Sequence, residues 1–188
     1  MTNLQPPDDA RDDVSLMAAL AAGHIPALDE LVRRHQEKVL ALALRTLGDP
    51  EAARDVAQEA FVKVLRSARR YRPEAKFTTW LYRIVVNCCV DLMRRRRPAA
   101  NLDDVAPPAA EDSVPDRAMR AEAALAVRRA VEALPDRQRL VVVLHRFAEL
   151  SHREVAQVTG WSNSAVESLL TRAYVALRER LARGGVDG

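Results

Sequence analysis

The 188-residue sequence contains few aromatic side chains, few glycines and only two cysteines. Phe, Trp and Tyr make up only 4% of it, whereas Ala, Leu, Val and Arg are abundant, a composition that favours helices over sheets. It has no apolar run long enough to span a bilayer, and its polar, acidic N-terminus does not resemble a signal peptide. We therefore expect an all-α, cytoplasmic protein without membrane insertion.

The cysteines and histidines do not show the spacing of a metal or redox site. Cys88 and Cys89 are adjacent in a predicted helix, where no ordinary disulfide closes, so we expect Cys88 to be a core residue. His35 lies on an apolar helix and is better explained by packing than by ligation. No Gly-rich phosphate loop is present. We expect no enzymatic activity, no cofactor and no bound metal.

Charge is distributed unevenly, although the formal net charge is only +3. Residues 1–30 contain six acidic residues and one Arg, and residues 99–116 contain five acidic residues and no basic one. The basic residues are therefore concentrated in the two segments that are predicted to fold. This pattern is expected when folded modules touch nucleic acid while the tail and linker do not.

Proline, glycine and capping signals divide the chain into four parts. Residues 1–12, which are acidic and contain Pro6 and Pro7, are predicted to be disordered. Residues 98–116 are acidic, contain Pro107 and Pro108, and lack a helical period, so they are predicted to form a flexible linker. Two helical domains are predicted on either side of this linker, at 13–97 and 117–183.

Local signals also predict the helices of the first domain. Asp12 or Asp13 can cap a short helix that Gly23 ends. The tripeptide 48–50, Gly-Asp-Pro, stops one helix and starts the next. The predicted helices cover residues 14–23, 26–47, 50–66 and 77–97.

The stretch from Asp55 to Arg97 is predicted to form two amphipathic helices joined by a basic, aromatic loop. In the first helix one face is apolar: Val56, Ala60, Phe61, Val64 and Leu65. The opposite face is polar apart from one valine: Asp55, Gln58, Glu59, Val62 and Arg66. In the second helix the predicted buried stripe is Phe77, Leu81, Ile84, Val85, Cys88 and Leu92, and the opposite stripe is Arg83, Asn87, Val90 and Arg94.

The same stretch has the composition of a single-strand nucleic-acid site. Between Ala60 and Pro98 there are eleven Lys or Arg and two acidic residues. Four aromatic residues are interleaved with them: Tyr71, Phe77, Trp80 and Tyr82. Basic side chains attract phosphates and aromatic faces stack on unpaired bases, so this combination suits single strands better than closed duplex. A helical bundle with a solvated basic face is the alternative interpretation.

The second domain contains a predicted helix-turn-helix. A helix from about Asp116 is followed by another that opens at Pro135. Residues 151–154, Ser-His-Arg-Glu, form a capping box, and a Gly-Trp turn at 160–161 precedes a new helix start at Ser162. The second helix of such a motif enters the major groove. Its apolar spacing is kept by Val166, Leu170, Ala173, Leu177 and Leu181, which leaves Ser164, Ala165, Ser168, Thr171 and Arg172 toward solvent or DNA.

These motifs resemble one family. DVAQEAF, FTTWLYRIVVN and the following Arg cluster resemble region two of the extracytoplasmic-function (ECF) class of bacterial RNA polymerase sigma factors. Residues 134–181 resemble region four of the same class, and the two resemblances together cover about residues 14–182. The resemblance implies an alternative sigma factor that binds RNA polymerase core, through its beta and beta-prime subunits, and directs it to specific promoters.

The resemblance also implies roles for individual residues. It assigns binding of the clamp helices of the largest core-polymerase subunit to Asp55, Gln58, Glu59 and Val62. Capture of the opened minus-ten element falls to Tyr71, Arg72, Lys76, Thr79, Trp80, Arg83, Asn87 and Arg94. Reading of the minus-thirty-five duplex falls to Asn163, Ser164, Glu167, Ser168, Thr171 and Arg172. The family further implies an anti-sigma factor, encoded elsewhere, as a partner.

Alternatives remain open for several of these features. The whole chain could be a helix-turn-helix regulator with an N-terminal sensing or dimerisation bundle. The face with Asp55 could be merely solvated, and Trp80 could be a packing residue. The resemblance implies a linker that threads toward the RNA exit path of the polymerase, but an inert spacer fits the sequence equally well. Many ECF recognition helices carry Lys or Arg where this chain has Glu167, which could read a cytosine, form a capping box with Ser164, or be solvated near the helix end.

Overall fold

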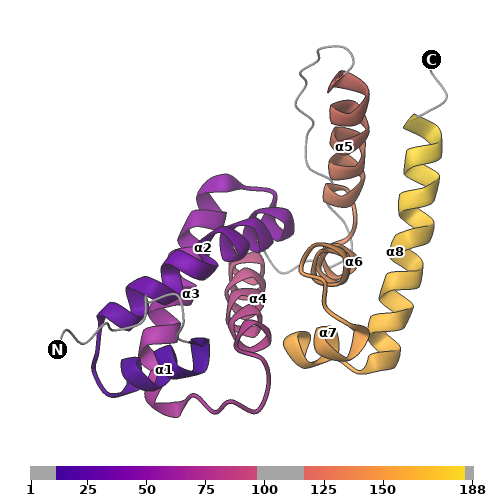
Figure 1. The fold of residues 1–188 in the computed structure, drawn as a ribbon. Coiled ribbons are helices and arrows are strands. Elements are labelled where there is room, and N and C mark those ends of the chain that lie inside the picture. Colours follow the sequence, from indigo (N-terminus) through magenta and orange to yellow (C-terminus); the bar gives the residue numbers. More distant parts are fainter. Residues whose placement is uncertain (1–11, 97–116, 185–188) are drawn as a thin grey trace.

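The computed structural model describes residues 12–96 and 117–184, and within them every regular element is helical (Figure 1). The predicted linker and nearly all of the predicted disordered N-terminus lie outside the described residues. The first group of helices is α1 (Asp13–Ala21), α2 (Pro26–Leu47), α3 (Pro50–Ser67), the short 3-10 helix η2 (Ala68–Arg70) and α4 (Phe77–Arg96). The second is α5 (Arg117–Glu132), α6 (Asp136–Val142), the π-helix η3 (Val143–Phe147), α7 (His152–Thr159) and α8 (Asn163–Gly184). The predicted all-α class is confirmed.

The predicted helix boundaries in the first group depend on caps that the structure contains. The Asp12 side chain accepts a hydrogen bond from the Ser15 backbone N–H at 2.7 Å, at the start of α1. Gly48 ends α2 in the left-handed conformation, with φ of 71°, which glycine adopts without steric cost. Asp49 then caps α3 by accepting hydrogen bonds from the backbone N–H groups of Glu51 and Ala52, at 3.0 and 3.2 Å. None of the helices in these described parts could span a membrane.

The core of the first group forms where α3 packs against α2 and α4. Most of the predicted apolar face of α3 is buried, but Leu65 is 39% exposed, so its assignment to the core was wrong. The neighbouring helices cover the line through Val56, Ala60 and Val64, and Leu65 lies beside that line. Ile84 is only partly buried on α4.

In the second group α8 packs against α5, α6 and α7. The predicted helix after Pro135 does not continue as an α-helix, since it becomes the π-helix η3 at Val143. Glu149, with φ of 56°, then turns the chain toward α7. On α8 the residues Val166, Leu170 and Ala173 are buried as predicted. Leu181 is 39% exposed, because it lies on the far end of α8, which extends beyond α7 (Figure 1).

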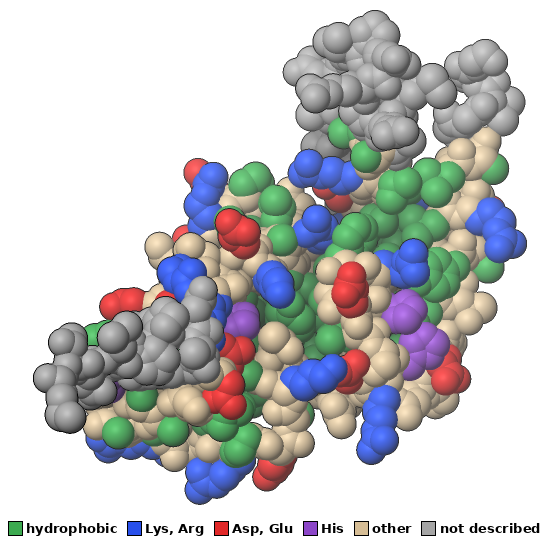
Figure 2. Space-filling model, in the orientation of Figure 1, with side chains coloured by type: hydrophobic (Ala, Val, Ile, Leu, Met, Phe, Trp, Pro, Cys, Tyr) green, Lys and Arg blue, Asp and Glu red, His purple; other side chains and the backbone are tan. Residues whose placement is uncertain are grey.

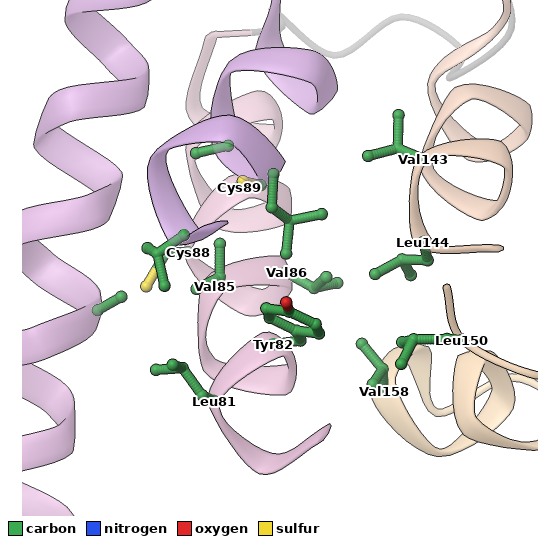
Figure 3. Packing of buried hydrophobic residues seen from close by; sticks show 14 of the residues in the cluster. Leu81, Tyr82, Val85, Val86, Cys88, Cys89, Val143, Leu144, Leu150 and Val158 are labelled. Carbon is green, nitrogen blue, oxygen red and sulfur yellow. The ribbon is translucent and has the colours of Figure 1, made fainter. Parts of the chain in front are cut away.

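The two groups of helices share one continuous apolar core. Tyr82 and Val86 on α4 point toward Leu144 of η3, and toward Leu150 and Val158 at α7 (Figure 3). Tyr82 is only 7% exposed, so it is not available to nucleic acid. The prediction that it belongs to the nucleic-acid site was wrong. We call this packing of α4 against η3 and α7 the closed arrangement.

Two polar contacts flank the closed arrangement. Lys76 Nζ lies 3.5 Å from Glu154 Oε1, which joins the loop before α4 to α7. The Arg45 guanidinium lies over the Phe147 ring, 4.8 Å from its centroid, which joins α2 to η3. Each contact involves at least one exposed side chain, so both contribute less than the apolar core between them.

Burial of the two thiols gives a direct test of this core. Cys88 and Cys89 are both free and are 2% and 1% exposed. Burial raises the pKa of both thiols, that of Cys89 to about 12. At pH 8 the thiolate fraction of Cys89 is then on the order of a thousandfold below that of an exposed cysteine. Native protein should resist iodoacetamide, as measured by mass spectrometry, and both thiols should react in urea. Rapid native labelling would contradict the buried placement.

Candidate nucleic-acid interface

One face of α3 presents a polar surface with an apolar centre. Asp55, Gln58, Glu59 and Val62 are all exposed, because they lie on the side of α3 opposite its buried residues. Val62 is 43% exposed, and Glu59 Oε1 lies 2.9 Å from Lys63 Nζ. Val62 therefore adds apolar surface to an otherwise polar face of α3.

Three aromatic rings gather where the loop after η2 meets the start of α4. The ring centroids of Tyr71 and Trp80 are 4.8 Å apart, those of Phe77 and Trp80 are 5.8 Å apart, and those of Tyr71 and Phe77 are 6.1 Å apart. We call these three residues the aromatic cluster. Trp80 is partly buried, so it packs on the core and still reaches the surface.

Basic and polar side chains surround the aromatic cluster on the surface. Arg72 and Lys76 are exposed in the loop, and Arg83, Asn87 and Arg94 are exposed along α4. Arg94 also donates a hydrogen bond to Asp91 at 3.0 Å.

Thr79 differs from the other predicted minus-ten residues because it is only 5% exposed. Its spacing places it on the same stripe of α4 as Tyr82 and Val86, which faces η3 and α7. In the closed arrangement Thr79 therefore cannot touch DNA. Figure 2 shows acidic and basic side chains interspersed on the visible face, without one large basic patch.

The helix-turn-helix geometry follows from the capping signals that predicted it. The Ser151 hydroxyl accepts a hydrogen bond from the Glu154 backbone N–H at 3.3 Å, and the Glu154 carboxylate accepts one from the Ser151 backbone N–H at 2.9 Å. The hydrogen bonds from the backbone and side chain of Ser151 hold the pKa of Glu154 below its ordinary value. Gly160, with φ of 75°, ends α7 and makes the tight turn to α8.

The recognition helix α8 begins as the sequence predicted, because the Ser162 hydroxyl accepts a hydrogen bond from the Ala165 backbone N–H at 3.2 Å. This start places Glu167 more than one turn inside the helix, with its side chain 62% exposed. Glu167 Oε1 lies 3.9 Å from His152 Nδ1. The predicted reading residues are all exposed: Asn163, Ser164, Glu167, Ser168, Thr171 and Arg172.

Asp13 and His35 form a pair behind the aromatic cluster, and the sequence did not indicate that they belong to this region. His35 Nε2 lies 3.0 Å from Asp13 Oδ2, and the His35 ring lies 5.1 Å from that of Phe77. The sequence correctly indicated that His35 is a packing residue, since it is 7% exposed. Its partners lie far away along the chain on other helices, so no local spacing could identify them.

Removing the α7 cap should weaken the second group of helices. Ser151→Ala deletes the hydroxyl that accepts the Glu154 N–H, so we expect the free energy of unfolding to fall by about 1 kcal/mol. Urea unfolding followed by circular dichroism measures it. Ser168→Ala, which removes an exposed hydroxyl beside Arg172, is the control and should stay within about 0.5 kcal/mol of the parent. Equal stability of Ser151→Ala and the parent would contradict the capping role.

A helical bundle followed by a helix-turn-helix is typical of proteins that bind DNA. The family model for Sigma-70 region 2 matches residues 31–99, and that for Sigma-70, region 4 matches residues 124–177. The chain is 39% identical over 175 residues to the ECF RNA polymerase sigma factor SigM of Mycobacterium tuberculosis, covering 92% of this chain and 84% of SigM. It is 34% identical over 185 residues to the RNA polymerase sigma-H factor of Pseudomonas aeruginosa, covering 90% and 93%.

Solved structures agree with these relatives. The structure of CnrH in complex with the cytosolic domain of CnrY has a TM-score of 0.66 and 31% identity, covering 91% of this chain and 97% of CnrH. The sigma factor RpoE in complex with the anti-sigma factor NepR from Bartonella quintana has a TM-score of 0.63 at 20% identity, covering 85% and 98%, and so shares the fold. The chain belongs to the ECF family of RNA polymerase sigma factors. It acts as an alternative sigma factor in promoter-directed transcription initiation.

Proposed function

We propose that three separate surfaces of this chain bind polymerase core, the opened minus-ten element and the minus-thirty-five duplex. The face of α3 with Asp55, Gln58, Glu59 and Val62 binds the clamp of the polymerase core, which includes the beta and beta-prime subunits. The observation that supports this most directly is the exposed Val62 at the centre of a polar face. Burial of such a residue on docking favours binding, and the polar rim sets the orientation.

The aromatic cluster and its basic surround then handle the opened minus-ten element. Trp80 stacks on or wedges beside an unpaired base, Arg83 contacts phosphate, and Asn87 hydrogen-bonds a base edge or the backbone. Arg72, Lys76 and Arg94 add positive charge around this path. The partial burial of Trp80 supports the assignment, because a ring anchored on one side is held ready for stacking on the other.

The exposed face of α8 reads the minus-thirty-five duplex. The carboxylate of Glu167 repels phosphate but can accept a hydrogen bond from cytosine N4, so it favours base choice over general affinity. Arg172 contributes the main phosphate or guanine contact of this face. Region four should therefore bind DNA weakly alone and depend on polymerase for its placement.

The closed arrangement must open for both elements to be bound. The minus-ten and minus-thirty-five elements are centred about 25 base pairs apart, roughly 85 Å along the duplex. In the closed arrangement Lys76, beside the aromatic cluster, and Glu154, at the start of α7, are 3.5 Å apart. We place the functional boundaries at 13–97 for core binding and minus-ten opening, and at 117–183 for minus-thirty-five reading.

Further aspects of this proposal concern the setting of the protein. CnrH, 31% identical to this chain, was solved in complex with a second protein, CnrY. By this likeness, an anti-sigma factor holds this chain until a stimulus releases it. The protein works in the cytoplasm, and it acts by binding and not by catalysis.

Charge reversal on α3 tests the core-binding face. The double variant Gln58→Lys with Glu59→Lys should lower affinity for RNA polymerase core at least fivefold, since interface anchors contribute about 1 kcal/mol or more each. Native gel titration against core measures it. Glu37→Lys, at an exposed position of α2, is the control for the change in charge. Unchanged affinity of the folded double variant would remove α3 from the interface.

Glu167→Lys tests the reading helix. The added positive charge should raise affinity across many duplexes and steepen the salt dependence, while preference at one base pair falls by about 1 to 3 kcal/mol. Competition binding of the holoenzyme to a randomised minus-thirty-five library gives both quantities. Glu179→Lys, farther along α8, controls for charge alone. If the preferred sequence is the same in both variants, Glu167 does not read bases.

A further inference from the structure

The Asp13–His35 pair connects α1 to the aromatic cluster. His35 is buried on α2, and its Nε2 is 3.0 Å from Asp13 Oδ2 at the start of α1. Arg34 Nη1 approaches the other carboxylate oxygen of Asp13 at 3.6 Å. The carboxylate is thus held from two sides by α2. A histidine ring that is hydrogen-bonded on one edge and enclosed by packing has one preferred orientation.

Phe77 lies between the His35 ring and the Trp80 ring, so the position of His35 affects the position of Trp80. The ring of His35 lies 5.1 Å from that of Phe77, at an interplanar angle of 52°. Phe77 is the first residue of α4, is 5% exposed, and lies 5.8 Å from the Trp80 ring. Because packed rings leave no free space, a shift of His35 also shifts Phe77. Trp80 packs against Phe77, so its ring shifts as well.

Tyr71 shows that α1 faces the cluster from a second direction. Helix α1 packs against η2, which directly precedes Tyr71. The Tyr71 hydroxyl is buried and lacks a hydrogen-bond partner among the described residues, and its ring lies 4.8 Å from Trp80. Burial first, and then the charges of Asp13 and Asp12, raise the pKa of that hydroxyl. Helix α1 is therefore linked to the cluster through the Asp13–His35 hydrogen bond, and it also packs on η2, the segment that leads into Tyr71.

We propose that Asp13 and His35 are positioning residues that orient Trp80 for opening of the minus-ten element, and that α1 is part of the opening site. The inference rests on the proposed role of Trp80. Neither residue contacts DNA in this scheme, since both lie behind the aromatic cluster. They act by keeping the Trp80 ring in one orientation before the strands separate, which removes a reorientation step from opening.

The first experiment follows Trp80 directly, without DNA. In a Trp161→Phe background the remaining tryptophan fluorescence comes from Trp80 alone. His35→Ala should raise the acrylamide quenching constant of Trp80 at least twofold. His35→Gln, which retains an N–H toward Asp13, should restore most of the protection. His24→Ala, at an exposed position between α1 and α2, is the matched control and should change nothing. Equal quenching in His35→Ala and the parent overturns the proposal.

The second experiment uses the holoenzyme on a promoter fragment selected from a genomic library by transcription with core. Two quantities are measured separately: the affinity for promoter DNA before its strands separate (the closed complex), and the rate of strand opening detected with permanganate. His35→Ala should lower the opening rate at least fivefold while core binding and closed-complex affinity stay within twofold, and His35→Gln should recover the rate. Loss of opening without a change in Trp80 quenching, or no rescue by His35→Gln, makes the pair merely structural and overturns the proposal.

Two further variants keep the test decisive. If His35→Ala does not fold, as judged by circular dichroism, Asp13→Leu carries the test, because it keeps a side chain of similar size and removes the oxygen that bonds His35 Nε2. It should raise quenching and slow opening in the same direction, and no effect on either would overturn the proposal. Trp80→Ala tests the function on which the inference rests. Normal opening by Trp80→Ala refutes the role of Trp80, whereas a defect in Trp80→Ala with normal His35→Ala refutes only the positioning pair.

Discussion

The apolar contact between α4 and the η3–α7 segment governs the arrangement of the whole described chain. Tyr82 and Val86 meet Leu144 and Val158 there, and burial of each such side chain contributes about 1.5 to 3 kcal/mol relative to exposure. This contact unites two helical groups into one core, and it brings the loop before α4 beside the helix-turn-helix. It also covers the stripe of α4 on which Thr79 lies, so Thr79 is shielded in the closed arrangement while the other predicted contact residues keep exposed surface.

Much of the secondary structure could be predicted because its signals are local. Asp49 caps α3 through its own side chain, and Gly48 ends α2 because glycine adopts positive φ easily. The capping box of Ser151 and Glu154 lies within four consecutive residues, so the start of α7 was also evident. The exposed face of α3 with Val62 followed from helical periodicity alone. In each case the determining interaction lies within one or two turns of chain.

The rest depends on contacts between distant segments. Tyr82 belongs by composition with the nucleic-acid aromatics, and only the packing of α7 against α4 explains its burial. Leu65 satisfies the apolar period, yet the neighbouring helices leave it exposed. The hydrogen bond from His35 to Asp13 joins α2 to α1, and no spacing rule links them. The π-helix η3 likewise has no local signal, and it occurs where the chain turns toward the shared core.

The shared core has a thermodynamic consequence for every ligand that needs the α4 stripe exposed. A molecule that binds only open chains has its apparent dissociation constant multiplied by the ratio of all chains to open ones, tenfold for each ~1.4 kcal/mol by which closure is favoured. Any partner that binds the open chain alone removes this factor for the next ligand. For such a ligand, the burial of Tyr82 and Val86 lowers the apparent affinity for as long as the closed arrangement persists.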